Sequence, residues 1–164
     1  MQDKTNETTA LTEASRKLLE LLPSILNEHK VEYGIELDEI TVTVSPELVN
    51  PICNTLKMNS LAAFDYLRCL SVVDYEDKLE MNYHLFSYTK RHKMVLKTEL
   101  TPIEPKVASV SSIWRTANWF ERESHDLFGI IFDDHPNLNS LLLPEGFEGH
   151  PGLKSYPLHE YKEW

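Results

Sequence analysis

The chain has 164 residues, of which 41% are hydrophobic, so it can form one domain with its own core, and wholesale disorder is excluded. Its net charge of −10 argues against nucleic acid as a partner and against direct adsorption to anionic lipid. No apolar run approaches the roughly 20 residues that span a bilayer, and the polar N-terminus has no apolar signal core. If the protein works at a membrane, we expect another protein to hold it there.

The first predicted element is a helix near the N-terminus. Residues 1–10 are polar and are expected to form a flexible lead. Apolar residues then recur at helical spacing over about 12–28, with Thr12 as the N-cap. Pro23 should kink this helix or split it, and an acidic loop should follow over 28–39.

The middle of the chain predicts a sheet. Residues 40–44 alternate and are β-branched, which is typical of a strand, and Ser45 and Pro46 should cap and start a helix. Three further alternating segments predict strands, at residues 64–75, 79–85 and 94–100. Because hairpin turns join consecutive strands of this group, we expect them to pair antiparallel.

A last helix should follow the connector at 102–105, capped by Ser111 or Ser112 and ended by Gly129. Its expected buried face comprises Ile113, Ala117, Phe120, Ser124 and Leu127. Beyond it, only the apolar runs 130–132 and 141–143 interrupt irregular chain.

These elements predict an α+β fold, with a mostly antiparallel sheet packed with helices and an extended irregular C-terminal arm. We place the domain at residues 11–132 and the C-terminal arm at 133–164. Tyr156, Tyr161 and Trp164 near the end could anchor the C-terminal arm to a neighbouring protein, or could fold back on their own domain.

The last predicted helix carries a tight charge cluster, which consists of Glu121, Arg122, Glu123 and Asp126. One interpretation is general acid–base catalysis by Glu121 with His125, which share a helix face. The other is an ion-pair network that fixes the helix against a partner or the following loop, in which carboxylates share the guanidinium fork of Arg122. We favour the second because no candidate nucleophile has a suitable context nearby.

Other cofactor and metal patterns find little support. Asp133, Asp134 and His135 are adjacent, but neighbouring loop residues rarely face one ion, and His135-Pro136 and His150-Pro151 instead predict turns. The glycines form no phosphate-binding loop, so flavin, NAD and ATP are not indicated.

The chain has two cysteines, Cys53 and Cys69, which are too few for an iron–sulfur cluster. They predict buried reduced thiols, although a disulfide between them stays open.

A set of residues between 117 and 157 forms one long, specific pattern. It comprises Ala117-Asn118-Trp119, Glu121-Arg122-Glu123, Asp126, Phe128-Gly129-Ile130, His135-Pro136, Leu138, Leu141 to Pro144, Gly149, Pro151, Lys154 and Tyr156-Pro157. This pattern resembles the signature of the NuoC-like subunits of respiratory complex I, the NADH–quinone oxidoreductase family. Residues 70–75 and 83–85 are similar to strands of that family, and the resemblance covers roughly residues 12–160.

The resemblance implies a scaffold subunit with no cofactor of its own, in the quinone module of the peripheral arm. It would pack on the D-type large subunit, which helps form the quinone site, and on neighbouring peripheral-arm subunits. The whole enzyme would use iron–sulfur clusters, pass electrons to quinone and pump ions. The chain would lie at the cytoplasmic face of the cell membrane, held there by the complex.

By the same resemblance none of the residues is catalytic or binds a cofactor or metal. The expected structural or interface residues are Trp119, Glu121, Arg122, Glu123, Asp126, Phe128, Gly129, His135, Pro136, Lys154, Tyr156 and Pro157.

The chain also departs from the family pattern. Asn139 and Ser140 stand where two arginines are usual, and Leu153, Lys154 and Ser155 replace an Arg-Lys-Asp run. The missing guanidiniums imply a divergent partner surface and leave the electron donor open among NADH, ferredoxin, deazaflavin and hydrogen.

Two alternatives therefore remain. One is the equivalent subunit of a complex-I-related membrane-bound hydrogenase or formate hydrogenlyase. The other is a free-standing hydrolase that uses Glu121 and His125.

Overall fold

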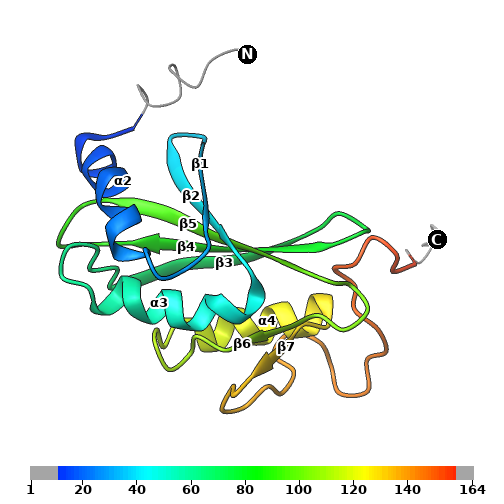
Figure 1. Ribbon diagram of the computed structural model, residues 1–164. Helices are drawn as coiled ribbons and strands as arrows, with labels where there is room; N and C mark the ends of the chain where they lie inside the picture. The colour runs from blue at the N-terminus through cyan, green and yellow to red at the C-terminus, as the bar shows by residue number, and fades with distance from the viewer. Residues whose placement is uncertain (1–10, 158–164) are drawn as a thin grey trace, which may run out of the picture.

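The computed structural model describes residues 11–157, which form a five-stranded sheet with helices (Figure 1). The sheet order is β1 (Glu32–Glu36), β2 (Glu39–Val44), β5 (Lys93–Leu100), β4 (Leu79–Phe86) and β3 (Tyr66–Asp74). Every neighbouring pair is antiparallel except β2 and β5, which are parallel because α3, β3 and β4 intervene along the chain. The predicted α+β fold with a mostly antiparallel sheet is confirmed.

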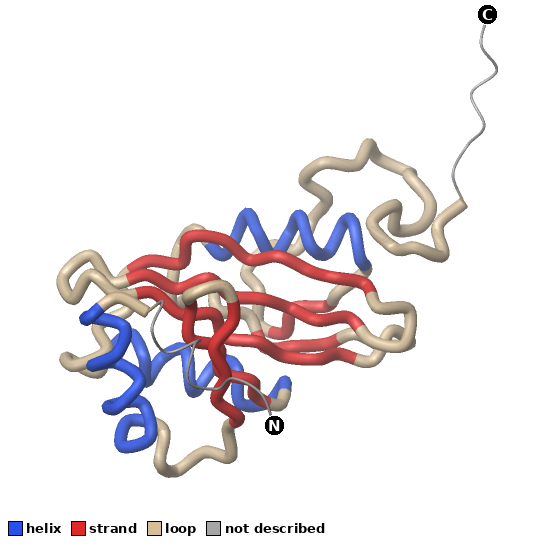
Figure 2. Tube along the Cα trace, turned by 90° about the horizontal axis from the view of Figure 1, so that it is seen from above, coloured by secondary structure: helices blue, strands red, loops and turns tan. Residues whose placement is uncertain are grey.

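The helices and two short strands complete the domain. They are α2 (Glu13–Ile25), the 3-10 turn η1 (Pro46–Leu48), α3 (Val49–Met58), α4 (Ala117–Phe128), β6 (Lys106–Ala108) and β7 (Ile131–Asp133). Helices α3 and α4 lie on the same side of the sheet, below it in Figure 1, and α4 contacts the edge strand β3. Seen from above in Figure 2, α4 follows that edge of the sheet, and the irregular chain beyond it leads to the C-terminus. Strands β6 and β7 form a separate parallel pair.

The core follows from strand alternation, since successive side chains of a strand point to opposite faces. Met81, Tyr83 and Leu85 of β4 are fully buried between the sheet and the helices. On the opposite face Lys93 and Lys97 of β5 form ion pairs with acidic side chains of other strands of the sheet and of the turn between β1 and β2. The sheet therefore has one apolar face and one charged face.

The first helix confirms its predicted start. The backbone N–H of Ser15 donates to Thr12 Oγ at 3.2 Å, as an N-cap requires. The helix ends at Ile25 rather than residue 28, and Pro23 does not split it, because this proline stands in the last turn.

Two strands were missed from the sequence. The expected acidic loop contains β1, which is stabilised as an edge strand by its ladder with β2 although its side chains do not alternate in polarity. Gly34 of β1 has no room for a side chain, because a Cβ there would lie 2.6 Å from Thr41 Oγ. Strand β6 follows the connector at 102–105 and exists only through its pairing with β7.

The predicted limits of three other elements were also wrong. Ser45 does not cap its helix, since its hydroxyl donates to Glu47, and the chain makes the 3-10 turn before α3 begins at Val49. The last helix begins at Ala117 instead of Ser111 or Ser112. The residues before it form successive turns that bury Trp114, whose Nε1–H donates to the Phe64 carbonyl at 3.1 Å. The β3 strand is shorter than expected and carries a bulge between Leu67 and Cys69.

The cysteines are both free. Cys53 is buried, and burial raises the pKa of its thiol. Cys69 is only half-buried, so the prediction of two buried thiols holds for one of them.

Candidate interaction site on helix α4 and the C-terminal arm

Helix α4 buries two carboxylates, Glu121 and Asp126, that the predicted buried face does not include. Ala117 and Ser124 are buried as predicted, and Ile113 is buried just before the helix, whereas Phe120 and Leu127 are only half-buried. The helix lies between the sheet and the C-terminal arm, of which the structure describes residues 133–157. The backbone N–H and C=O groups of an irregular segment need hydrogen-bond partners from elsewhere. This requirement explains why charged residues occupy the side of α4 that faces the C-terminal arm.

Glu121 is completely buried, with both carboxylate oxygens hydrogen-bonded. The Ser109 hydroxyl donates to Oε2 at 2.6 Å, and the Val110 backbone N–H donates to Oε1 at 2.7 Å. Burial raises the pKa of Glu121 to about 7, although both donors act to lower it. Glu121 therefore ties α4 to the turn that follows β6.

Asp126 holds the leucine run of the C-terminal arm. Its Oδ2 accepts the backbone N–H groups of Leu141 and Leu142 at 2.7 Å each, and of Leu143 at 3.2 Å. Burial would raise the pKa of Asp126, but these donors outweigh it and hold the pKa below its usual value. A single carboxylate thus fixes three consecutive peptide units.

Arg122 binds the segment just before the leucine run. Its Nε–H donates to the Asn139 carbonyl and its Nη2–H to the Ser140 carbonyl, both at 2.9 Å. The guanidinium also lies 5.6 Å from the ring centre of Trp119. The expectation that carboxylates share this guanidinium was wrong, because main-chain carbonyls occupy the fork.

The end of α4 is closed by a second part of the C-terminal arm. Gly129 ends the helix with a left-handed φ of 74°, as predicted. His150 Nδ1 donates to the Asp126 carbonyl at 2.9 Å, and the Gly152 N–H donates to the Leu127 carbonyl at 2.8 Å. These bonds satisfy carbonyl groups that a helix end leaves without intrahelical partners.

The last described part of the C-terminal arm returns to the sheet. The Lys154 backbone N–H donates to Asp74 Oδ2 at 2.8 Å, at the end of β3. Phe147 and Tyr156 stack with ring centres 6.1 Å apart, so this stretch is folded on itself.

The remaining predicted site residues occupy varied positions. Glu123, Pro136 and Pro157 are exposed, and Phe128 is half-buried against Gly152. His135 begins the C-terminal arm, and its side chain is completely buried beside Glu121.

Glu121 and His125 do not form the pair that the hydrolase interpretation needs. His125 Nδ1 bonds to the Ile130 carbonyl at 2.9 Å, whereas the histidine near Glu121 is His135, with Nε2 3.7 Å from Oε2. Within residues 11–157, no group of three or more His, Cys, Asp or Glu side chains is arranged to hold a metal ion. Among the same residues, no helix is both long and apolar enough to cross a membrane.

Sequence reasoning missed several partners of this site, namely Asp74, Ser109, Val110, His150 and Gly152. Their only sequence signal is the His-Pro-Gly run at 150–152, which predicts a turn but not the helix end that the turn closes. The others act through main-chain groups or lie far away in sequence, so no local pattern identifies them.

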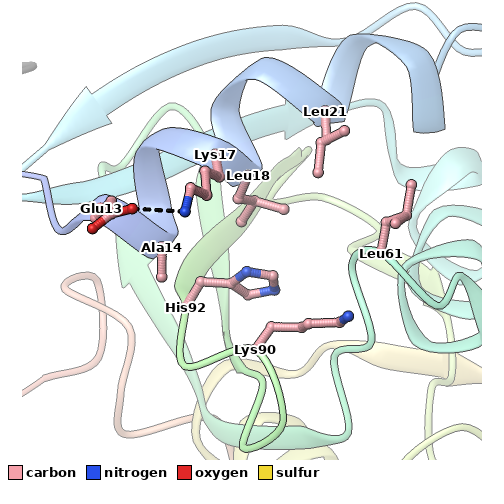
Figure 3. A pocket seen from close by; sticks show the side chains of 8 residues that line it. All are labelled: Glu13, Ala14, Lys17, Leu18, Leu21, Leu61, Lys90 and His92. Atoms are coloured by element: carbon pink, nitrogen blue, oxygen red, sulfur yellow. Dashed lines mark hydrogen bonds and ion pairs between the residues drawn. The ribbon is translucent and has the colours of Figure 1, made fainter.

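A groove lies at the opposite end of the domain, between α2 and the turn joining β4 to β5 (Figure 3). Its lining residues are Glu13, Ala14, Lys17, Leu18, Leu21, Leu61, Lys90 and His92. His92 is fixed there, since its Nε2 bonds to the Ala62 carbonyl at 2.7 Å. Figure 1 shows α2 and the C-terminal arm at opposite ends of the sheet, so the groove is separate from the α4 site.

The fold and the α4 site define a small α+β domain that holds a long C-terminal arm in a fixed path. The sequence pattern of the family described as "Respiratory-chain NADH dehydrogenase, 30 Kd subunit" matches residues 42–162. The C subunit of NADH-quinone oxidoreductase from Salinispora tropica is 36% identical over 128 residues, which cover 76% of this chain and 52% of that protein. The chain belongs to this family of complex I subunits.

The chain spans about half the length of the Salinispora relative, and between 51% and 77% of other relatives. Its fold is similar to that of several solved structures, two of which are compared. One is a trypsin-resistant fragment of Nqo5, with a TM-score of 0.60 and 22% identity, covering 74% of this chain and 99% of the fragment. The other belongs to the membrane-bound sulfane sulfur reductase, described as an archaeal respiratory membrane complex. It has a TM-score of 0.63 and 22% identity, covering 73% of this chain and 72% of the other.

Proposed function

We propose that this chain is a scaffold subunit, without a cofactor of its own, in the quinone module of a complex-I-type, ion-translocating quinone oxidoreductase. It packs on the large subunit that binds quinone and on neighbouring subunits of the peripheral arm. The complex holds it at the cytoplasmic face of the membrane. Membership of this family of complex I subunits supports the type of complex.

The observation that carries the scaffold role is the use of the α4 charges. Arg122 and Asp126 direct their side chains to main-chain groups of the C-terminal arm, so neither group is left to act on a substrate. Their bonds fix the path of a segment that has no helix or strand of its own between residues 134 and 157. A preorganised irregular surface loses less conformational entropy when a partner binds.

Exposed apolar side chains on the same surface support a protein partner. Trp119 of α4 is 61% exposed, and Leu142, whose backbone N–H bonds to Asp126 of the same helix, is 56% exposed. Trp and Arg are enriched among the residues that dominate binding energy at interfaces, and Trp119 stands beside Arg122. We assign the contact with the quinone-site large subunit to this surface.

The equivalent subunit of a membrane-bound hydrogenase or formate hydrogenlyase is the second candidate. It is favoured by the similar fold in the membrane-bound sulfane sulfur reductase, an archaeal respiratory membrane complex. It is also favoured by Asn139 and Ser140, which depart from the arginines usual in the NuoC-like pattern. The neighbouring large subunit distinguishes the candidates, because only a hydrogenase-type large subunit keeps four cysteines for a nickel–iron site.

The test is an affinity purification of the tagged full chain from mildly solubilised native membranes, followed by mass spectrometry. We expect a quinone-site large subunit, iron–sulfur subunits and antiporter-like membrane subunits. Recovery of the chain alone, as a soluble monomer, would overturn the proposal. A large subunit with nickel–iron cysteines would support the second candidate instead.

Substitution of exposed apolar residues tests whether the surface of α4 and the C-terminal arm contacts the large subunit. The double variant Trp119→Ser and Leu142→Ser should recover the large subunit at least about 30-fold less efficiently, since a single interface hot spot contributes about 2 kcal/mol or more. The control is Tyr88→Ser, because Tyr88 is 57% exposed but lies in the turn that joins β4 to β5, away from α4. Equal recovery of both variants would exclude the α4 surface as the contact.

A further inference from the structure

The structure contains a buried pair of titratable groups where the C-terminal arm leaves the domain. The side chains of Glu121 and His135 are both 0% exposed, and Glu121 Oε2 lies 3.7 Å from His135 Nε2. This distance is too long for a hydrogen bond. Within residues 11–157, His135 Nε2 is one of two buried side-chain nitrogen or oxygen atoms with no hydrogen-bond partner. A buried polar atom without a partner costs free energy, so this arrangement calls for an explanation.

The second nitrogen of His135 fixes the protonation state of the ring. The Asn137 backbone N–H donates to His135 Nδ1 at 3.1 Å, so Nδ1 is the nitrogen without a proton. The neutral ring therefore carries its hydrogen on Nε2, which faces Glu121. Burial lowers the pKa of His135, and Arg122 and His125 act in the same direction, whereas the Asn118 and Asn137 backbone act to raise it. The net effect favours the neutral imidazole.

In the part of the chain that the structure describes, the groups around Glu121 provide no cation to compensate its charge. Cys53 of α3 and Tyr83 of β4 face it, and burial keeps both neutral by raising the pKa values of the thiol and the phenol. On α4 itself, Arg122 donates to carbonyls of the C-terminal arm and His125 bonds to the Ile130 carbonyl. Burial without a cation is consistent with the pKa of about 7 for this carboxyl.

A chain of hydroxyl groups beside Glu121 can hydrogen-bond to its carboxyl group in either protonation state, because the direction of the hydrogen bonds can reverse. Ser109 Oγ lies 2.6 Å from Glu121 Oε2 and 2.7 Å from Ser111 Oγ, and either hydroxyl of that second bond can be the donor. When Glu121 is ionised, the Ser109 hydroxyl donates to it. When Glu121 is protonated on Oε2, its hydroxyl donates to Ser109, which then donates to Ser111. The neutral acid therefore keeps its hydrogen bonds without any heavy atom moving.

We propose that Glu121 is a proton-binding site whose occupancy controls how tightly the root of the C-terminal arm, residues 134–138, is held against α4. With the proton bound, a neutral acid lies beneath a neutral imidazole, and the root stays closed. When the proton leaves, a buried carboxylate remains with an imidazole too distant to donate to it. Opening the root admits water to this charge, so deprotonation favours the open state.

The proposal predicts the direction of the pH effect. The closed state has a raised pKa of about 7 for Glu121, whereas an open, hydrated carboxyl returns towards 4.5. The closed state therefore binds the proton between these values, and its stability falls as the pH rises from 4.5 and levels off above 7. Between about pH 5.5 and 8 the ratio of open to closed molecules should increase about 30-fold.

Hydrogen exchange of the full chain, as isolated from its native source, measures this opening after correction for the intrinsic pH dependence. The reporters are the amides of Val110 and Asn137, which bond to Glu121 and His135. Their protection should fall about 30-fold between about pH 5.5 and 8 in the wild type. It should stay constant in Glu121→Gln, whose amide resembles the protonated acid. Glu123→Gln is the matched control, since Glu123 is exposed on the same helix, and should behave as the wild type.

Two results would overturn the proposal. One is a constant protection factor in the wild type, or an equal fall in Glu121→Gln. The other is protection that rises with pH below about 6.5, because His135 would then be the titrating group. If Glu121→Gln does not fold, infrared spectroscopy of the wild type decides the matter. The carbonyl stretch of a protonated buried acid should disappear near pH 7, and its absence at about pH 5.5 would contradict the proposal.

Discussion

At the scale of single residues, α4 shows how position sets the behaviour of a carboxylate. Glu121 and Asp126 lie on the same helix and are both buried. Glu121 receives two hydrogen bonds and has a raised pKa, whereas Asp126 accepts three N–H groups on one oxygen and has a lowered pKa. Desolvation therefore dominates at one site and hydrogen bonding at the other.

Replacement of Asp126 by Asn should loosen the C-terminal arm at the leucine run. The amide lacks the negative charge that strengthens the three N–H bonds, so we expect a loss of about 1–2 kcal/mol in the free energy of unfolding. The loss should be measured by urea unfolding at neutral pH, with Glu123→Gln as a control that changes stability by less than about 0.5 kcal/mol.

The same variant should remove part of the acid sensitivity of the protein. Because the folded state lowers the pKa of Asp126, its stabilisation is present above the ordinary value of 3.8 and is lost as the pH falls through the folded value. The difference between wild type and variant should therefore shrink below about pH 4. A difference that grows there would contradict the assigned role of Asp126.

The scale of helices and strands shows which features local sequence determines. Thr12 caps α2 as predicted and Gly129 ends α4 as predicted, because both depend on neighbouring residues alone. Ser45 has the same local pattern as Thr12 but bonds to Glu47, and α4 begins later than its serines suggest. Burial of Trp114 against the chain just before β3 determines that start, and this contact is far away in sequence.

In the candidate site, too, local sequence predicts some features and not others. The sequence identifies Glu121, Arg122 and Asp126 as a cluster that fixes α4 against another segment. It does not identify their partners, since most are backbone groups of irregular chain. Main-chain donors and acceptors occur at nearly every residue, so no side-chain pattern predicts which of them are used.

Replacement of Gly129 by Ala tests the junction between α4 and the C-terminal arm. A Cβ at this position would lie 2.7 Å from the His150 ring, and its left-handed φ adds about 1–2 kcal/mol of strain. The matched control is Gly146→Ala, since Gly146 has a φ of 82° but nothing within 4 Å of its Cβ position. Thermal unfolding should show a larger loss for Gly129→Ala. Equal losses would mean that His150 moves aside without cost.

At the scale of the whole molecule, the C-terminal arm, as far as residue 157, is part of the folded unit and not an appendage. His135 covers Glu121, while Leu138 and Leu153 pack against the core. The division into a domain at 11–132 and an arm at 133–164 stays a prediction, and these contacts cross it. Stability should therefore depend on both sides of the division.

A chain that ends at Asp133 tests this dependence. It loses the groups that bind Asp126 and the end of α4, together with the apolar contacts of the arm. We expect its free energy of unfolding, measured in urea, to be roughly 3 kcal/mol lower than that of the full chain. The double variant Leu138→Ala and Leu153→Ala measures the apolar share separately. An unchanged midpoint for the shortened chain would show that the domain is independent of its arm.

The attachment of the C-terminal arm through its backbone has a consequence for how this protein can diverge. Most of the groups that α4 and β3 bind are main-chain groups, namely the carbonyls of 139 and 140 and the N–H groups of 141–143, 152 and 154, and the His150 ring adds a side-chain bond. Substitution at most of these positions leaves the bonded atoms in place. Evolution can therefore rewrite the exposed side chains, as at Asn139, and adapt the surface to a new neighbour while the path of the chain is inherited unchanged.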